Sequence, residues 1–75
     1  MNKRQIMKLK EEKNEIYSRI KKLDRFITSP ECKQLSIAEK NMLRAQHEAM
    51  FVYGLILRDR IAYYEGKPTC NNWEV

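Results

Sequence analysis

The sequence predicts an all-α protein: an antiparallel helical hairpin with a short connecting turn helix, which assembles into a homo-oligomer. Two long segments show the apolar spacing of amphipathic helices, and turn and capping residues separate them. The chain of 75 residues has only two Gly and two Pro, too few for the turns of a β-sandwich. A chain this short buries only about 60% of the surface of its unfolded form, so we expect partner subunits to stabilise it.

The first helix is expected over about residues 3–28. Its apolar residues alternate in steps of three and four, which makes a heptad stripe, and no Gly or Pro interrupts them. Lys13 lies within this stripe, where its stem can pack while its ammonium group reaches solvent or a polar pocket. The stripe consists of Ile6, Leu9, Lys13, Ile16, Ile20, Leu23 and Ile27.

The connection begins where Ser29 and Pro30 end the first helix. Proline after a serine cap is a helix-start signal, so a one-turn helix is expected near residues 30–34. Ser36 and Glu39 then have the spacing of a capping box, in which each side chain satisfies the other residue's backbone amide.

The second helix is expected over about residues 37–65. Gly66 is a typical helix stop, and the proline that follows it cannot continue a helix. We therefore interpret residues 1–65 as a single helical hairpin domain and residues 66–75 as a flexible C-terminal tail.

The second helix also predicts the assembly. The run 49–57 is apolar on every face of a helix, and such a helix must be surrounded. One partner helix from the same chain covers only one side, so other subunits must cover the rest. Gly54 costs about 1 kcal/mol relative to Ala in mid-helix, and its use is to let another backbone come close.

A polar stripe crosses this apolar region, because Gln46, Tyr53 and Arg60 lie seven residues apart on one face. Each side chain could simply point to solvent. Alternatively, symmetry could bring copies of Arg60 together into an anion pocket, or Arg60 could stabilise the negative end of its helix dipole.

The net charge of +5 lies entirely on residues 1–25, because the remainder of the chain is balanced. This surplus fits either a solvated helix face or an anion-binding surface. A DNA-binding protein would also carry a basic helix, but no helix-turn-helix spacing or Arg-rich recognition helix is present. Duplex nucleic acid is therefore an unfavoured partner.

Catalytic and metal-binding functions are not supported. His47 is the single histidine, no Gly-rich phosphate loop occurs, and two cysteines with one histidine do not supply the four ligands of a zinc site. Cys32 and Cys70 are expected to stay reduced in an intracellular chain. No signal peptide or membrane span is present either. We expect a binding protein without a cofactor. The alternative is a small basic helical protein that binds DNA or serves only structural oligomerisation.

The spacing within both helices resembles that of a known family. The second helix places polar residues at Gln46, Tyr53 and Arg60 among regularly spaced apolar ones, and the first helix ends Ile20-x-x-Leu23-x-x-Phe26-Ile27-x-Ser29. Over about residues 5–62 this pattern resembles the small phage proteins that sequester cyclic nucleotide signals, the anti-CBASS sponge family of T-even and crAss-like phages.

The resemblance implies a compact homohexamer that binds messengers without cleaving them and so keeps CBASS effectors inactive in the cytoplasm of the infected host. It implies cyclic dinucleotides, such as cyclic GMP-AMP, bound between the first helices of two protomers, and cyclic trinucleotides in separate pockets. The family's phosphate-binding lysine falls at Lys21 or Lys22, whereas its stacking aromatic falls near Met7, where this chain has no ring. Tyr17 is the nearby aromatic and is a candidate for stacking or for packing. The expected dinucleotide site comprises Met7, Lys10, Lys13, Tyr17, Lys21 and Lys22. The expected trinucleotide site comprises Gln46, Tyr53 and Arg60.

Overall fold

The computed structural model describes residues 1–69, and its regular elements are all helices. No strand occurs among these residues, which confirms the all-α class. The bounds of each long helix agree with the predicted ones to within about one residue. Predictions for residues 70–75, including Cys70 and most of the tail, lie outside the described residues. The elements are α1 (Lys3–Ile27), the 3₁₀ helix η1 (Pro30–Gln34) and α2 (Ile37–Tyr64).

Helix α1 begins with a capping box that the sequence analysis did not identify. The backbone amide of Gln5 donates to the Asn2 side chain at 2.9 Å, and the backbone amide of Asn2 donates to Oε1 of Gln5 at 3.1 Å. These bonds satisfy amides that the first turn of a helix leaves without partners. They fix the start of α1 at Lys3.

The N-terminal cap of α2 contains one of the two hydrogen bonds of the predicted capping box. The hydroxyl of Ser36 accepts from the backbone amide of Glu39 at 3.1 Å, as expected. However, the Glu39 carboxylate accepts from the Ser36 hydroxyl, also at 3.1 Å, and the structure assigns only the serine half of the box. The Glu39 side chain therefore lies beside the connection between the two helices.

Gly66 ends α2 through a Schellman motif. Its φ of +74° lies in the left-handed region that glycine adopts without strain. The amide of Gly66 donates to the carbonyl of Tyr63 at 3.1 Å, and that of Lys67 donates to Ala62 at 2.8 Å. This pair of bonds satisfies the last carbonyls of the helix.

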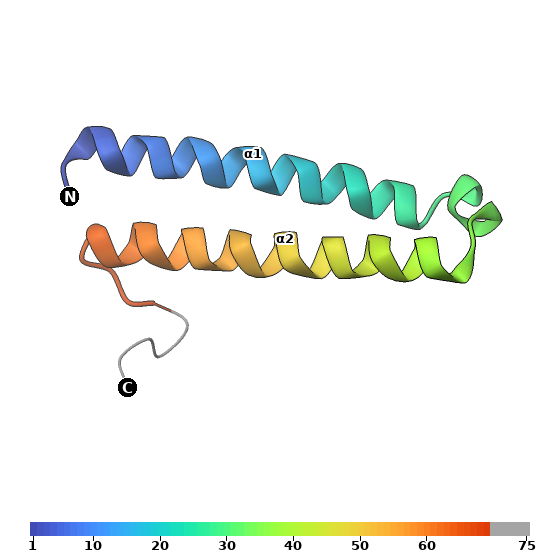
Figure 1. Ribbon diagram of the computed structural model, residues 1–75. Coiled ribbons are helices and arrows are strands. Elements are labelled where there is room, and N and C mark those ends of the chain that lie inside the picture. The colour runs from blue at the N-terminus through green and yellow to red at the C-terminus, as the bar shows by residue number, and fades with distance from the viewer. Residues whose placement is uncertain (70–75) are drawn as a thin grey trace.

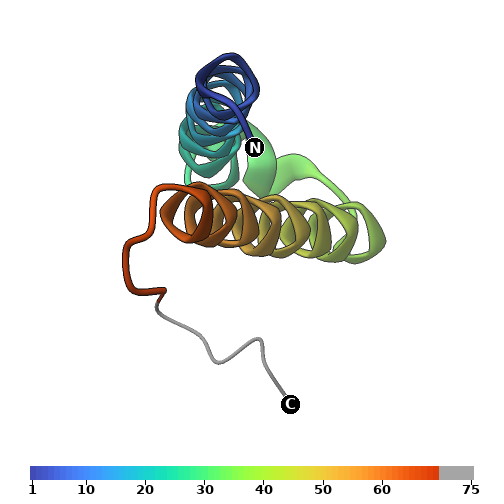
Figure 2. The same cartoon turned by 90° about the vertical axis from the view of Figure 1, so that its left-hand side faces the viewer.

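Helices α1 and α2 lie side by side and run in opposite directions, with η1 closing one end (Figures 1 and 2). Two contacts between polar side chains of the two helical arms agree with this direction. Near the chain start, Nζ of Lys10 lies 3.0 Å from Oε2 of Glu65. Near η1, Oδ1 of Asp24 lies 3.6 Å from Nε2 of His47.

The seam between the helices is built from the predicted apolar stripe of α1. All seven of its residues are buried or half-buried. Leu9, Leu57 and Ile61 form the buried cluster, and Ile6 and Ile16 pack against it. The facing stripe of α2 has the same heptad spacing and comprises Lys40, Leu43, His47, Met50, Gly54, Leu57 and Ile61.

Gly54 lies against the ring of Tyr17 in the seam. A Cβ atom at this position would lie 2.7 Å from Cε1 and 3.2 Å from Cδ1 of Tyr17. The Tyr17 ring therefore occupies the space that any other residue's side chain would fill. Gly54 was expected to let another backbone come close, but within the protomer the group that comes close is the side chain of Tyr17. A backbone approach from another subunit stays a prediction.

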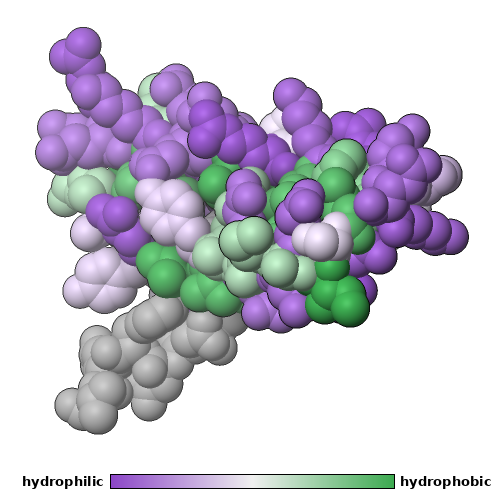
Figure 3. Space-filling view, turned by 45° about the vertical axis from the view of Figure 1, so that its right-hand side comes forward, coloured by the Kyte–Doolittle hydropathy of each residue, from purple (hydrophilic) through white to green (hydrophobic). Residues whose placement is uncertain are grey.

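The side of α2 turned away from the seam is apolar and uncovered. Val52 is 53% exposed and Met42 is 64% exposed. In Figure 3 the hydrophilic side chains gather over α1, and hydrophobic ones emerge below them. We call this side the outer stripe of α2; its spacing is again three and four. It comprises Met42, Ala45, Ala49, Val52 and Ile56.

Replacing Gly54 by Ala tests the close approach of Tyr17. Alanine is favoured over glycine by about 1 kcal/mol inside a helix, but here its Cβ would press on the Tyr17 ring. We expect Gly54→Ala to bring no gain in the free energy of unfolding in the wild-type background. In a Tyr17→Ala background the same change should add about 1 kcal/mol. Urea unfolding followed by circular dichroism measures both; equal gains in the two backgrounds would contradict the contact.

Candidate functional site

The helix pair has two edges, one on each side of the seam. Residues of α1 that flank its seam stripe on either side face one edge or the other, and residues further around the helix face away from α2. We call the two edges the Tyr17 edge and the Tyr53 edge. The Tyr17 edge comprises Lys10, Tyr17 and Asp24 of α1. The Tyr53 edge comprises Glu12, Arg19 and Phe26 of α1 with Gln46, Tyr53 and Arg60 of α2.

On the Tyr17 edge, Lys10 is already paired. Its ammonium group donates to the carboxylate of Glu65, and this hydrogen bond is the main reason that the pKa of Glu65 is lowered. Lys67 lies 3.5 Å from the other Glu65 oxygen and adds to the effect. A phosphate group that binds Lys10 must therefore compete with a carboxylate.

Tyr17 serves the packing of the two helices. Its ring lies over the backbone of Gly54, and Nζ of Lys13 lies 5.9 Å from the ring centroid. This distance is within the range of a cation–π interaction. Lys13 thus packs its stem in the seam, and its ammonium group lies over an aromatic ring. The packing alternative for Tyr17 is the one that these contacts support, and its role in stacking stays a prediction.

Met7, Lys21 and Lys22 are exposed and do not face α2. Met7 and Lys21 lie on the same outward face but are fourteen residues apart, about 21 Å along the helix axis. One protomer therefore does not bring the six residues of the predicted dinucleotide site together. Lys10, Lys13 and Tyr17 are close to one another, Met7 and Lys21 lie at the two ends of this row, and Lys22 lies outside it.

On the Tyr53 edge, the Tyr53 hydroxyl donates a hydrogen bond to the carboxylate of Glu12. This bond raises the pKa of the Tyr53 hydroxyl, because ionisation would place a second negative charge beside the carboxylate. Arg60 acts on the same hydroxyl with the opposite sign, since its positive charge favours the phenolate. Glu12 was not among the predicted site residues, because its partner comes from the other helix.

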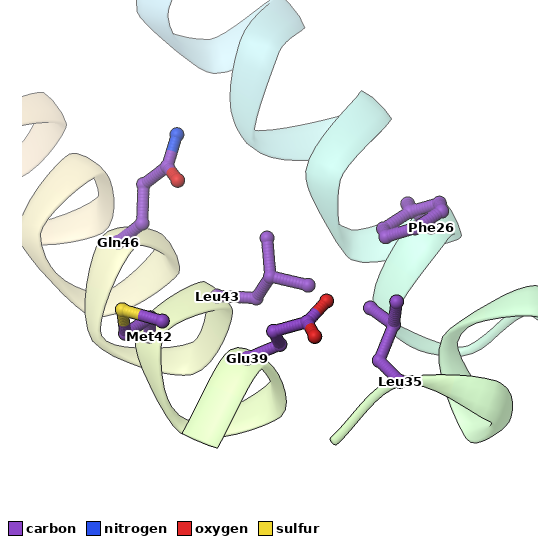
Figure 4. Close-up of a pocket in the computed structure, with 6 residues that line it drawn as sticks. All are labelled: Phe26, Leu35, Glu39, Met42, Leu43 and Gln46. Carbon is purple, nitrogen blue, oxygen red and sulfur yellow. The ribbon is translucent and has the colours of Figure 1, made fainter. Parts of the chain in front are cut away.

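Gln46 lies on the same edge, nearer to η1. Nε2 of Gln46 contacts the sulfur of Met50 at 4.0 Å, which is a weak interaction. Gln46 also lines a hollow of about 300 Å³ where α1, η1 and α2 meet (Figure 4). The hollow contains five residues that sequence reasoning did not assign to any site. Its lining comprises Phe26, Leu35, Glu39, Met42, Leu43 and Gln46.

The described residues offer no group of three or more His, Cys, Asp or Glu side chains that could hold a metal ion. Cys32 is buried in η1 as a free thiol, and His47 pairs with Asp24. No helix in residues 1–69 is long and apolar enough to cross a bilayer.

Comparison with known proteins gives one match. The model of the Sequestin family matches residues 3–63, which include all of α1 and η1 and nearly all of α2. No curated protein and no solved structure matches the chain. The family match covers most of the chain and confirms the resemblance to the phage sponges of cyclic nucleotide signals. The chain belongs to the Sequestin family.

Proposed function

We propose that this protein is a phage anti-defence protein that binds and sequesters cyclic nucleotide messengers in the cytoplasm of the infected bacterium. By holding the messenger without cleaving it, the protein keeps the CBASS effector from being activated. The observation that carries this proposal is the Sequestin match over residues 3–63. The net charge of +5, which resides on residues 1–25, supports an anionic ligand.

Sequestration requires tight binding and no chemical step. Nanomolar affinity corresponds to about 12 kcal/mol. Charge-assisted hydrogen bonds to phosphate are about twice as strong as neutral ones, and stacking on a base contributes about 1–3 kcal/mol. A cyclic dinucleotide has two phosphates and two bases, so a few such contacts in a site that excludes water are sufficient.

Two protomers can complete the dinucleotide site. Met7 and Lys21 are equidistant in sequence from Asn14. An antiparallel pair of α1 helices with its two-fold axis at Asn14 would place Met7 beside Lys21 of the partner subunit, at both ends of the pair. This arrangement joins the separated residues of the predicted site and matches a ligand that is itself nearly two-fold.

A homo-oligomer, a hexamer by the family resemblance, also accounts for the exposed apolar surface. The buried hydrophobic residues of the described chain are Leu9, Cys32, Leu57 and Ile61. This core is small for a stable monomer. The outer stripe of α2 has heptad spacing, which is the pattern of a helix that packs against another helix. We infer that a second subunit covers it.

The trinucleotide pocket is proposed at the Tyr53 edge. Arg60 is exposed there, and its charge acts on the Tyr53 hydroxyl. Three copies of Arg60 around a three-fold axis would repel one another without an anion, and a cyclic trinucleotide supplies three phosphates. Glu12 adds a negative charge at this edge, so phosphate binding there needs the positive charge of Arg60, to which Arg19 on the same edge adds.

The first test is calorimetry against cyclic dinucleotides, cyclic trinucleotides and duplex DNA. We expect tight binding of a cyclic nucleotide, and at least tenfold weaker dinucleotide binding in Lys22→Glu or Lys21→Glu, because a phosphate contact is replaced by repulsion. Lys33→Glu, the same charge change in η1, is the control. Duplex binding with a steep salt dependence would favour a DNA-binding protein instead. If none of these ligands binds, the remaining interpretation is a purely structural oligomerisation protein.

The second test is Arg60→Ala, with Arg44→Ala as the matched control on the opposite edge. Loss of Arg60 should abolish cyclic trinucleotide binding and leave dinucleotide binding nearly unchanged, because Arg60 is not part of the dinucleotide site. Calorimetry with both ligands measures the effect. Unchanged trinucleotide binding would contradict a role in ligand binding and would leave Arg60 only its interaction with the negative end of the α2 dipole.

The third test concerns the assembly. Light scattering should give a mass well above the 9.1 kDa of one chain. Val52→Glu places a charge on the outer stripe and should dissociate the oligomer while α1 and α2 stay helical, because Val52 lies outside the seam. Asn41→Glu, also exposed on α2 but outside the stripe, is the control. A monomeric wild type would refute the oligomer and the two-protomer site together.

A further inference from the structure

The hollow at the closed end of the helix pair is lined by residues of α1, of α2 and of the connection between them. Its six lining residues are mainly apolar, and its volume of about 300 Å³ exceeds that of a purine base. Figure 4 shows Leu43 and Glu39 directed from α2 toward Phe26 and Leu35, while the Gln46 side chain extends toward α1.

The charge of the lining residues indicates which part of a nucleotide can enter the hollow. No Lys or Arg lines the hollow, although the chain has fifteen of these residues. Its charged member is Glu39. A carboxylate repels phosphate, so the hollow fits a neutral group that donates hydrogen bonds, and the phosphates of a ligand must lie outside it.

The apolar members favour a flat ring. Phe26 is 40% exposed, which leaves part of its ring open to a ligand. A base that stacks on this ring would be enclosed by Leu35 and Leu43 as well. This would supply the aromatic platform that sequence reasoning could not place at Met7.

The polar members favour guanine among the common bases. Guanine presents two adjacent donors, N1–H and the N2 amino group, which match the two oxygens of a carboxylate. One Glu39 oxygen accepts from the Ser36 hydroxyl, but a carboxylate has about four acceptor positions and can accept further bonds. The amide of Gln46 can donate to or accept from the other edge of the base. Adenine has no comparable pair of donors.

The cations needed for the phosphates lie just outside the hollow. Lys22 precedes Phe26 by four residues, so the two side chains are neighbours on the surface of α1. Arg19 precedes Phe26 by seven residues and lies on the same edge. A nucleotide whose base enters the hollow would therefore direct its phosphate toward these cations.

We propose that this hollow is a guanine-selective base pocket, in which Phe26 stacks on the base and Glu39 accepts hydrogen bonds from its N1–H and N2 amino groups. The proposal rests on the proposed function, because it names the base that the sequestered nucleotide presents.

The experiment compares cyclic di-GMP with cyclic di-AMP by calorimetry. The wild type should bind cyclic di-GMP more tightly. Glu39→Gln should weaken cyclic di-GMP binding by about tenfold or more, because an amide group then opposes the donors of guanine, and should leave cyclic di-AMP binding nearly unchanged. Glu48→Gln, an exposed carboxylate elsewhere on α2, is the control. Glutamine can still accept the Ser36 bond, and urea unfolding checks that stability is retained.

Phe26→Leu provides a second variant, because leucine keeps the packing and removes the stacking face. It should weaken the binding of cyclic di-GMP by about fivefold or more. Phe51→Leu, another exposed aromatic, is its control. Unchanged selectivity in Glu39→Gln, or equal losses for both ligands, overturns the base pocket while leaving sequestration intact. Failure of the wild type to bind any cyclic nucleotide overturns the proposed function and the pocket with it.

Discussion

The contact of the Tyr17 ring with the backbone of Gly54 sets the register of the two helices. Because this ring occupies the place of a side chain at Gly54, α1 cannot slide along α2 without a clash or a void. Every pairing at the two edges follows from that register. It places Lys10 at Glu65 on one edge and Glu12 at Tyr53 on the other.

The same register divides the molecule into surfaces with different chemistry. Hydrophilic side chains, many of them Lys and Arg, cover the outward face of α1 (Figure 3), whereas the outer stripe of α2 is apolar. A protein that must hold an anionic messenger and also assemble benefits from this separation, since a charge buried in a subunit interface is costly. One protomer has a small core and leaves the outer stripe of α2 exposed. Assembly would bury this stripe between subunits and so complete the burial of apolar surface that a single chain begins.

Contacts within the protomer also limit which lysines are available to bind a ligand. Lys10 and Lys13 are engaged within the protomer, the first by Glu65 and the second by the ring of Tyr17. Lys21 and Lys22 are exposed on the part of α1 that faces away from α2, so the contacts of the seam do not engage them. Phosphate binding therefore falls more naturally to the outward lysines than to those near the seam.

The sequence by itself determined the helical class, the helix bounds and the α1 stripe, because heptad spacing and capping residues are local signals. It also determined the family, through a pattern that spans both helices. Only the tertiary structure decided that Glu12 binds Tyr53, that Tyr17 fills the space at Gly54, and that Phe26 and Glu39 line one hollow. These contacts join residues far apart in the chain, and they depend on the register of one helix against the other, which no local spacing encodes.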